Sequence, residues 1–171
     1  MLIVLAGLPG TGKSAVAREL AHRTAAVWVR IDSIEQALRD SGALRRPLED
    51  LGYRVAYAVA EDNLRTGRTV VADSVNPLAV TRAAWLDVAR RAGCAAVNVE
   101  VRCSDPLEHR RRLEHRAIDV PGLAGPTWND VLAREYHPWD SEHIALETAG
   151  RRLDECVDEL LAKLRARTCP V

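Results

Sequence analysis

The sequence predicts an α/β fold in which helices cover both faces of a parallel sheet. Strand-like apolar segments alternate with segments of helical periodicity along the chain, which is typical of this architecture. The glycine-rich stretch GLPGTGKS (7–14) directly follows the first apolar run, LIVLA, as in a strand–loop–helix unit. With 171 residues, the chain has the length of a single domain that can bury a substantial core.

The expected elements follow from composition and periodicity. Apolar and β-branched runs predict strands at 2–6, 27–31, 69–72, 95–101 and 143–148. Helical patterns lie near 13–23, 33–40, 50–66, 77–92, 105–116, 127–136 and 151–166. One face of the last segment is apolar and is expected to pack on the sheet: Leu153, Val157, Leu160, Leu161 and Leu164.

Several helix starts carry capping signals. The pair Ser104–Asp105 precedes Pro106, which is expected in the first turn of a helix. Thr127 is followed three residues later by an acid, the pattern of a capping box. Asn76, directly before a proline, is expected to cap the helix that follows it.

The composition excludes several classes of partner. Apolar residues make up 47% and charged residues 28%, as in a soluble globular protein, and the net charge is zero. No bulk positive field therefore draws the chain to nucleic acid or to an anionic membrane, although a local basic patch stays possible. LIVLA is too short for a signal sequence or a membrane span, so we expect a cytoplasmic protein without a membrane partner.

Cysteines, histidines and lysines add three further expectations. The four cysteines (Cys94, Cys103, Cys156 and Cys169) show no C-x-x-C spacing and are expected to be free thiols. The five histidines form no zinc-ligand pattern with them. Of the 24 basic residues only Lys13 and Lys163 are lysine, and the others are arginine. The lysine inside the glycine-rich loop is therefore an exception to the chain's use of arginine.

The glycine-rich stretch fits G-x-x-x-x-G-K-[ST], the loop that wraps nucleotide phosphates in backbone N–H groups. Glycines let the backbone approach the phosphates closely, and the following helix points its N-terminus at the anion. Lys13 is expected to reach the β- and γ-phosphates, and Ser14 to offer its hydroxyl to Mg²⁺. The expected nucleotide-binding residues are Gly7, Leu8, Pro9, Gly10, Thr11, Gly12, Lys13 and Ser14.

Two hydrolytic classes of phosphate-loop protein fit poorly. The guanine-reading pattern N-K-x-D needs a lysine after the loop, and only Lys163, in AKLRA, is present there. Oligomeric ATPases have a strand that ends in Asp-Glu, whereas here VVA is followed by Asp73 and Ser74. Transfer of the terminal phosphate to an acceptor is therefore favoured over hydrolysis.

Two aspartates stand at expected strand ends, where ligands bind in parallel sheets. Asp73 is interpreted as the acid that holds a water of the Mg²⁺ shell or lies near the acceptor. Asp32 has two readings of equal weight on chemistry alone. It could be a general base that accepts the proton of an attacking hydroxyl, or a helix cap in DSIE, with Glu35 three residues on.

The arginine-rich segment EHRRRLEHR (108–116) runs into DVPGLAGP (119–126), the best candidate for a mobile loop. We expect a lid at about 110–126 that delivers one or two arginines to the γ-phosphate. The alternative is a solvated helix with Glu108–Arg112 and Arg110–Glu114 pairs. The aromatic residues beyond it could stack on an acceptor but are more simply part of the core: Trp128, Tyr136 and Trp139.

The order of these motifs is similar to that of a known group. GLPGTGKS, then RID (30–32), VVADSVN and RLEHR before a loop resembles the small AAA-type P-loop kinases of the polynucleotide-kinase, zeta-toxin and chloramphenicol-phosphotransferase group, over residues 2 to about 164. The resemblance implies a P-loop NTPase fold with a five-stranded parallel sheet, one kinase domain over 1–171, and ATP with Mg²⁺. The chain departs from many relatives after Asp32, where Arg39 in SIEQALR lies further on than their arginine.

The resemblance also assigns residues. Asp32 matches the acid that activates the acceptor hydroxyl, which raises it above the capping alternative. Asp73 matches the acid at the end of the third strand, and Arg112 and Arg116 match the R-x-x-x-R at the lid. ETAG (147–150) is similar to the loop that borders the adenine, which adds Thr148 and Gly150 to the nucleotide-binding set.

Two classes of function stay open from the sequence. The first is an ATP-dependent kinase, with a small-molecule hydroxyl acceptor favoured over a polynucleotide 5′-hydroxyl because a strand-binding groove would need basic and aromatic residues. The second is a nucleotide-binding regulator or partner-dependent ATPase without an acceptor, in which Asp32 would serve only as a helix cap.

Overall fold

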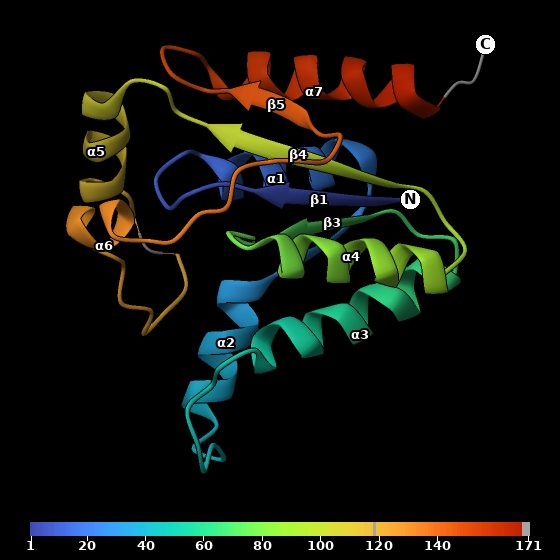
Figure 1. Ribbon diagram of the computed structural model, residues 1–171, viewed down its shortest axis with the longest axis horizontal. Helices are drawn as coiled ribbons and strands as arrows, with labels where there is room; N and C mark the ends of the chain where they lie inside the picture. Colours follow the sequence, from blue (N-terminus) through green and yellow to red (C-terminus); the bar gives the residue numbers. More distant parts are fainter. Residues whose placement is uncertain (118, 169–171) are drawn as a thin grey trace.

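The computed structural model describes residues 1–117 and 119–168 (Figure 1). Cys169 lies outside the described residues, and the other cysteines (Cys94, Cys103 and Cys156) are free thiols. The elements, in chain order, are β1 (Leu2–Ala6), α1 (Lys13–Thr24), β2 (Val27–Arg30), α2 (Ile31–Asp40), α3 (Leu51–Arg65), β3 (Val70–Asp73), α4 (Ala79–Arg91), β4 (Ala96–Arg102), α5 (Pro106–Glu114), α6 (Trp128–Leu132), β5 (Ile144–Glu147) and α7 (Leu153–Thr168).

The sheet has five parallel strands in the order β2-β3-β1-β4-β5, which confirms the predicted fold class. β1 is central, between β3 and β4, and its apolar residues are completely buried. All strands point the same way, so the loops that follow them meet at one edge of the sheet. This edge places the glycine-rich loop, the end of β3 and the start of α2 close together.

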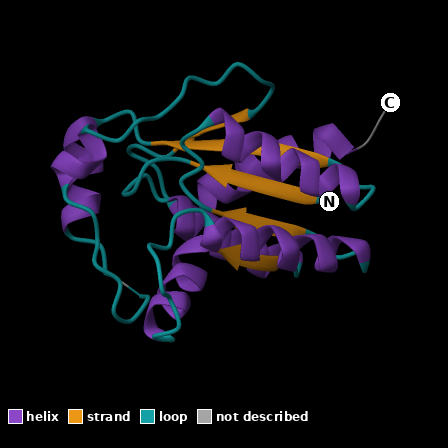
Figure 2. Ribbon diagram, turned by 60° about the horizontal axis from the view of Figure 1, so that its bottom comes forward, coloured by secondary structure: helices purple, strands orange, loops and turns teal. Residues whose placement is uncertain are grey.

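Two helical layers enclose the sheet (Figure 2). Successive residues of β1 face opposite layers, as the two-residue period of a strand requires. Ile3 and Leu5 pack in one apolar cluster with α1 and α7, whereas Leu2 and Val4 pack in the other with α3 and α4. The apolar face of α7 is therefore a core face from Val157 to Leu164, but Leu153, which was also expected to pack on the sheet, is 38% exposed and lies outside the cluster. The helices cover both sides of the sheet as predicted.

α5 and α6 lie together at the carboxyl edge of the sheet, and α2 with the connection to α3 projects from the molecule near the same edge (Figure 1). The predicted caps of both α5 and α6 are confirmed. Asp105 accepts hydrogen bonds from the N–H groups of Leu107 and Glu108, and Thr127 forms a capping box with Asp130. Among the helices of the described residues, none is long and apolar enough to cross a membrane.

Two predicted caps are wrong. β2 ends at Arg30 and α2 begins directly at Ile31, so Asp32 lies in the first turn and its side chain makes no capping hydrogen bond. α4 begins only at Ala79, after Leu78, and Asn76 is not its cap. Asn76 is instead fully buried with φ of 45°, where its side chain donates to the Leu5 carbonyl at 2.9 Å and accepts from the indole of Trp85 at 3.1 Å.

The segment after α6 also differs from the prediction. The helix expected over 127–136 ends at Leu132, because the chain beyond it is held by the buried guanidinium of Arg82. Arg82 donates to the carbonyl oxygens of His137 at 2.8 Å and Pro138 at 3.1 Å, and to those of two residues before α4. The aromatic residues expected in the core are only half-buried and lie outside both core clusters: Trp128, Tyr136 and Trp139.

Candidate active site

The glycine-rich loop has the conformation of an anion cradle. Gly7, Gly10 and Gly12 have φ of 148°, 91° and 90°, which only glycine adopts without strain. A Cβ on Gly7 would lie 2.4 Å from the carbonyl oxygen of Val101, and one on Gly10 would lie 3.0 Å from atoms of His109 on α5. The loop is therefore wedged between β4 and α5, and a larger residue at either position would displace it.

α1 begins at Lys13 directly after this loop. Its N-cap, Gly12, has no side chain to accept from the first N–H groups, and its first turn carries no acid. These N–H groups are thus left for an external anion, which the positive end of the helix dipole also favours.

A buried ion pair joins the loop to the sheet. The Lys13 ammonium lies 2.8 Å from one carboxylate oxygen of Asp73, and both side chains are almost inaccessible to solvent. The other oxygen of Asp73 accepts from the indole N–H of Trp28 at 3.3 Å. Asp73 is therefore fixed at the end of β3, beside the cradle, by donors from two different elements.

The loop opens onto a cavity of about 1270 Å³. This exceeds the 300–1,000 Å³ typical of a single small-molecule pocket, so it has room for a nucleotide and a second molecule. Most predicted loop residues line it: Leu8, Pro9, Gly10, Gly12, Lys13 and Ser14. Gly7 and Thr11 lie behind this surface, where Thr11 donates its hydroxyl proton to the Leu8 carbonyl at 2.9 Å.

Asp32 lines the same cavity from the first turn of α2. One turn later, burial raises the pKa of Glu35, and the charge of nearby Asp32 adds to this effect, while Arg39 opposes it. Glu35 packs directly on the start of α3, since a Cβ on Gly52 would lie 2.4 Å from its Cγ. The close approach of α3 thus keeps the first turn of α2, with Asp32, at the cavity wall.

Arg112 lies beside the glycine loop, where a Cβ on Gly12 would be 3.8 Å from its Nη1. It donates to the hydroxyl of Thr148 at 2.9 Å and to its carbonyl oxygen at 2.8 Å, and it pairs with Glu108 at 2.6 Å. Thr148 also lies 2.8 Å from the carbonyl oxygen of Thr11, so it links the turn after β5 to the glycine-rich loop. Arg116, beyond the end of α5, lines the cavity without a direct contact to this network.

The turn after β5 is well ordered by hydrogen bonds. The Glu147 carboxylate accepts from the backbone N–H groups of Ser104, Thr148 and Ala149, at 2.8–3.0 Å. These bonds outweigh partial burial and lower the pKa of Glu147. Thr148 faces the cavity, whereas Gly150 lies outside its lining and donates its N–H to Glu108 at 2.8 Å.

Comparison with known proteins identifies this arrangement. Residues 2–124 match the family model AAA_33, described as an AAA domain. The chain belongs to the AAA_33 family. A shikimate kinase from Symbiobacterium thermophilum is 31% identical to this AAA_33 chain over 185 aligned residues, which cover 98% of each chain.

Solved structures agree with this family on the fold. An APS kinase from Mycobacterium tuberculosis, in complex with AMPPNP and APS, has a TM-score of 0.71 at 22% identity and covers 96% of both chains. A gluconokinase from Sinorhizobium meliloti 1021 has a TM-score of 0.65 at 21% identity and covers 96% of this chain and 91% of its own. The AAA_33 chain is thus a kinase-like P-loop NTPase; membership of the polynucleotide-kinase, zeta-toxin and chloramphenicol-phosphotransferase group stays a prediction.

The residues beside the cradle suit Mg²⁺. Ser14 lines the cavity and offers a hydroxyl oxygen. Asp73 is 2% exposed, lies outside the lining and already accepts from Lys13 and Trp28, so it would act on the ion through a water of its shell. Among the described residues, no group of three or more His, Cys, Asp or Glu side chains is placed to hold a metal alone. An ion bound here would therefore take its other ligands from phosphate oxygens and water.

The sequence interpretation missed His109. This buried histidine lies on α5, its Nε2 is 2.7 Å from the carbonyl oxygen of Pro9, and its ring packs edge-on against Trp128 at 5.1 Å. Because a carbonyl only accepts, Nε2 carries a proton. His109, Arg112 and Leu113 have the spacing of one helix face, and this spacing could have revealed that α5 packs on the loop.

The sequence interpretation also assigned no role to Arg30, the first residue of the RID motif. Its side chain is only 9% exposed, lines the cavity, and pairs with Asp119 at 2.9 Å. The hydrogen bond to Arg30 lowers the pKa of Asp119. Arg30 thus joins the base of the cavity to the loop between α5 and α6.

Proposed function

We propose that this chain is an ATP-dependent phosphotransferase that moves the γ-phosphate of Mg·ATP to a hydroxyl of a small-molecule acceptor in the cytoplasm. The observation that carries the proposal is that Asp32, from the first turn of α2, lines the same cavity as the loop residues Lys13 and Ser14. A carboxylate placed across from the phosphates is what an acceptor hydroxyl requires. The relatives named as shikimate kinase, APS kinase and gluconokinase support this class of reaction.

The nucleotide would bind through this chain's backbone and cations. The glycine loop and the first turn of α1 donate N–H groups to the phosphates, and Lys13 supplies a positive charge. Ser14 and Asp73 would hold Mg²⁺, which when bound neutralises phosphate charge. Thr148 and Arg112 would border the nucleotide, since both lie against the glycine loop.

Asp32 would act on the acceptor. Its carboxylate accepts the hydroxyl proton as the acceptor oxygen forms a bond to the γ-phosphorus, and the bond from that phosphorus to the ADP oxygen breaks. We propose that Arg112 and Arg116 stabilise the charge that develops on the γ-phosphate, with Arg116 delivered by closure of a lid over about 110–126. Closure also excludes water, which would otherwise compete with the acceptor.

A small-molecule acceptor is favoured over a polynucleotide. The cavity is large, but the chain has no net positive charge to attract a nucleic-acid strand. Its aromatic residues Tyr136 and Trp139 pack against Arg82 at 5.1 and 4.1 Å and do not line the cavity. The aromatic residues that do line it, Trp28 and Tyr53, are held by hydrogen bonds to Asp73 and to the backbone N–H of Asn76.

The test is ADP release from Mg·ATP with and without hydroxyl acceptors, including sugars, nucleosides, hydroxy acids, hydroxylated amines and a 5′-OH oligonucleotide. We expect one acceptor class to stimulate release, and Asp32→Asn to reduce the stimulated rate by roughly 10²–10⁴-fold while nucleotide affinity is retained. The control is Asp62→Asn, an exposed aspartate on α3 that does not line the cavity. Steady hydrolysis that needs no acceptor and survives Asp32→Asn would instead indicate a regulatory ATPase.

A further inference from the structure

The two ends of the cavity carry opposite charges. Cationic side chains come from the glycine loop, α1, α5, the segment after it, and the turn after β5. Acidic side chains come from α2, the α2–α3 connection and α6. The cations that line the cavity from the first set of elements are Lys13, Arg18, Arg112, Arg116 and Arg151, and the acids from the second set are Asp32, Glu35, Glu49, Asp50 and Asp130; Arg30, Arg134 and Asp119 line it as well.

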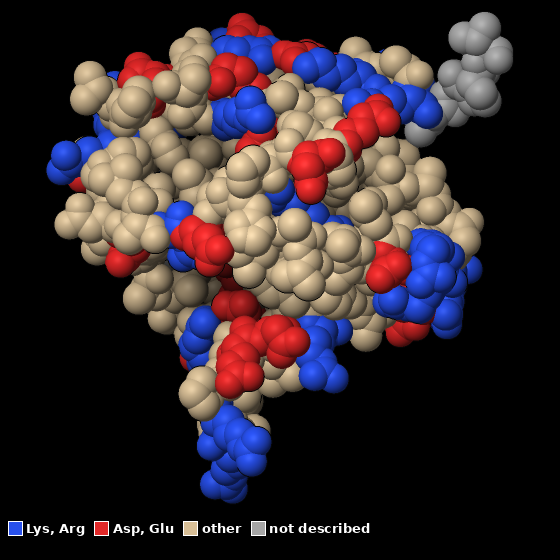
Figure 3. All heavy atoms as spheres, in the orientation of Figure 1, with Lys and Arg blue, Asp and Glu red and all other residues tan. Residues whose placement is uncertain are grey.

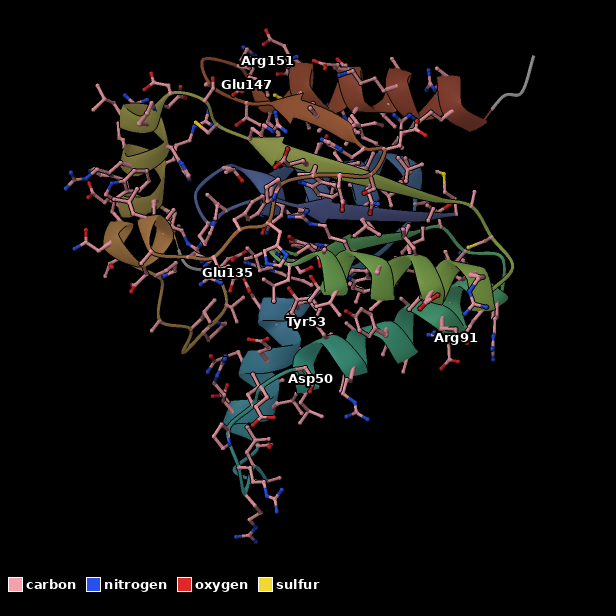
Figure 4. The ribbon with its side chains drawn as sticks, in the orientation of Figure 1. Asp50, Tyr53, Arg91, Glu135, Glu147 and Arg151 are labelled. Carbon is pink, nitrogen blue, oxygen red and sulfur yellow. The ribbon has the colours of Figure 1, made fainter. Side chains whose placement is uncertain are left out.

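Figure 4 labels one charged residue from each set, Asp50 and Arg151. Asp50 and Tyr53 lie at the beginning of α3, whereas Arg151 lies across the molecule at the turn between β5 and α7. In Figure 3, acidic atoms gather over the start of α3 below the sheet. The basic end matches a nucleoside triphosphate, and the acidic end faces whatever molecule receives the phosphate.

The acidic end is only partly neutralised by the protein. Arg30 is occupied by Asp119 at 2.9 Å, and Glu35 pairs with Arg39 at 3.1 Å. Arg134 adds one more cation to this end of the lining. Within the described part of the chain, Asp32, Glu49 and Asp50 have no ion-pair partner. Several carboxylates around the acceptor volume thus have no direct ion pair, while Arg45 and Arg46 share a smaller neighbouring cavity with Glu49 and Asp50.

Two unsatisfied buried polar atoms belong to residues that line the same cavity. Ser74, which is 4% exposed, and Arg30 both line the cavity. Among the described residues, the Ser74 hydroxyl and the Arg30 Nε have no hydrogen-bond partner. The Ser74 hydroxyl lies near that of Tyr53 but forms no hydrogen bond of ordinary geometry with it. Buried polar atoms are normally satisfied, so these two positions indicate a ligand with hydroxyl groups.

We propose that the acceptor is a hydroxylated cation, such as an amino sugar or an amino alcohol, and not a hydroxy acid. This inference rests on the proposed kinase function and names the substrate class of the same site. Ammonium groups would neutralise the free carboxylates, and hydroxyl groups would bond to Ser74 and to Arg30 Nε. A carboxylate acceptor would instead meet charges of its own sign, and such contacts disfavour a wrong partner strongly.

The first experiment measures binding of three probes to the complex with Mg·AMPPNP by titration calorimetry. The probes are kanamycin, its fully N-acetylated derivative, which keeps the hydroxyls and lacks the charges, and gluconate. We expect kanamycin to bind about tenfold or more tightly than either, with an affinity that falls as salt is added. Equal binding of the N-acetylated form, tighter binding of gluconate, or no binding of kanamycin would overturn the inference.

The phosphates of the bound nucleotide also attract cations, so a variant is needed to show that the acidic side chains of the cavity contribute to kanamycin affinity. Asp50 is the N-cap of α3 but makes no capping hydrogen bond, so Asp50→Asn removes a charge without removing a structural contact. We expect kanamycin affinity to fall about three- to tenfold and AMPPNP affinity to stay unchanged. Asp62→Asn, on the same helix and outside the cavity, is the matched control and is expected to change neither.

The outcomes also separate the two proposals. Phosphorylation of gluconate or shikimate without binding of kanamycin would leave the kinase function standing and overturn the cationic acceptor. Binding of kanamycin that depends on Asp50 but yields no phosphorylated product with Mg·ATP would support the charge assignment and count against the kinase function. Asp50→Asn with unchanged kanamycin affinity would overturn the role of the acidic wall.

Discussion

The nucleotide end and the acceptor end of the cavity are built in different ways. The nucleotide end is mostly one uninterrupted stretch of chain, residues 7–14, whose conformation follows from glycines and the start of a helix. The acceptor end is assembled from α2, the start of α3 and the segment after α6, which are brought together only by tertiary packing. A phosphate site can therefore persist while the acceptor wall changes, which is how one fold serves many acceptors.

The largest effect is expected from removing the cation of the nucleotide end. Lys13→Met keeps the length of the side chain but deletes the charge that pairs with Asp73 and would meet the phosphates. We expect acceptor-stimulated ADP release to fall roughly 10³-fold, the loss typical of a preorganised charge. The control is Lys163→Met, which changes the only other lysine, a surface residue paired with Glu159 on α7, and is expected to leave turnover unchanged.

The second largest effect is expected from removing Arg82, the residue that anchors the acceptor end. Arg82 is 4% exposed, donates to four carbonyl oxygens and lies 4.1 Å from the ring of Trp139, so it holds the segment after α6 against the start of α4. Arg82→Met leaves those carbonyls without a donor, and we expect a loss of about 2–4 kcal/mol in the free energy of unfolding.

Urea unfolding of Arg82→Met measures this loss in the free energy of unfolding. Kinetics of the folded variant should show a raised KM for the acceptor and little change in the KM for ATP. Arg90→Met on the same helix removes only an exposed pair with Asp87 at 3.2 Å. Its expected change is below about 0.5 kcal/mol. Equal losses in the two variants would argue against Arg82 as an anchor.

The nucleotide end depends on local sequence patterns and the acceptor end on tertiary packing, and this difference decides which site residues the sequence can predict. The loop, Asp73 and the parallel sheet follow from local patterns, and the structure places them together. Asp32 lines the cavity, but the prediction that it caps α2 is wrong because β2 passes into α2 without an intervening residue. His109 and Arg82 escaped notice because their partners lie 100 and about 55 residues away in the chain, where no local pattern reports them.

A smaller effect is expected where α5 supports the loop. His109→Phe keeps an aromatic ring against Gly10 and Trp128 but deletes the proton donated to the Pro9 carbonyl. One hydrogen bond of about 1 kcal/mol corresponds to an affinity for Mg·AMPPNP that is about fivefold weaker, with the acceptor KM unchanged. Trp128 fluorescence and calorimetry can both measure this. His115→Phe, an exposed position at the end of the same helix, should have no effect on affinity.

The smallest effect concerns the pH dependence of the acceptor end. Burial raises the pKa of Glu35 above its ordinary value, so its ionisation disfavours the folded state. Wild-type stability should therefore decline as the pH rises from the ordinary glutamate pKa, about 4.3, through the raised value. Glu35→Gln removes this titration while losing the pair with Arg39, so its stability relative to wild type should improve by less than about 1 kcal/mol between pH 4 and pH 7. Urea unfolding at the two pH values gives this difference, and a relative loss for the variant would show that the ion pair outweighs burial at the acceptor wall.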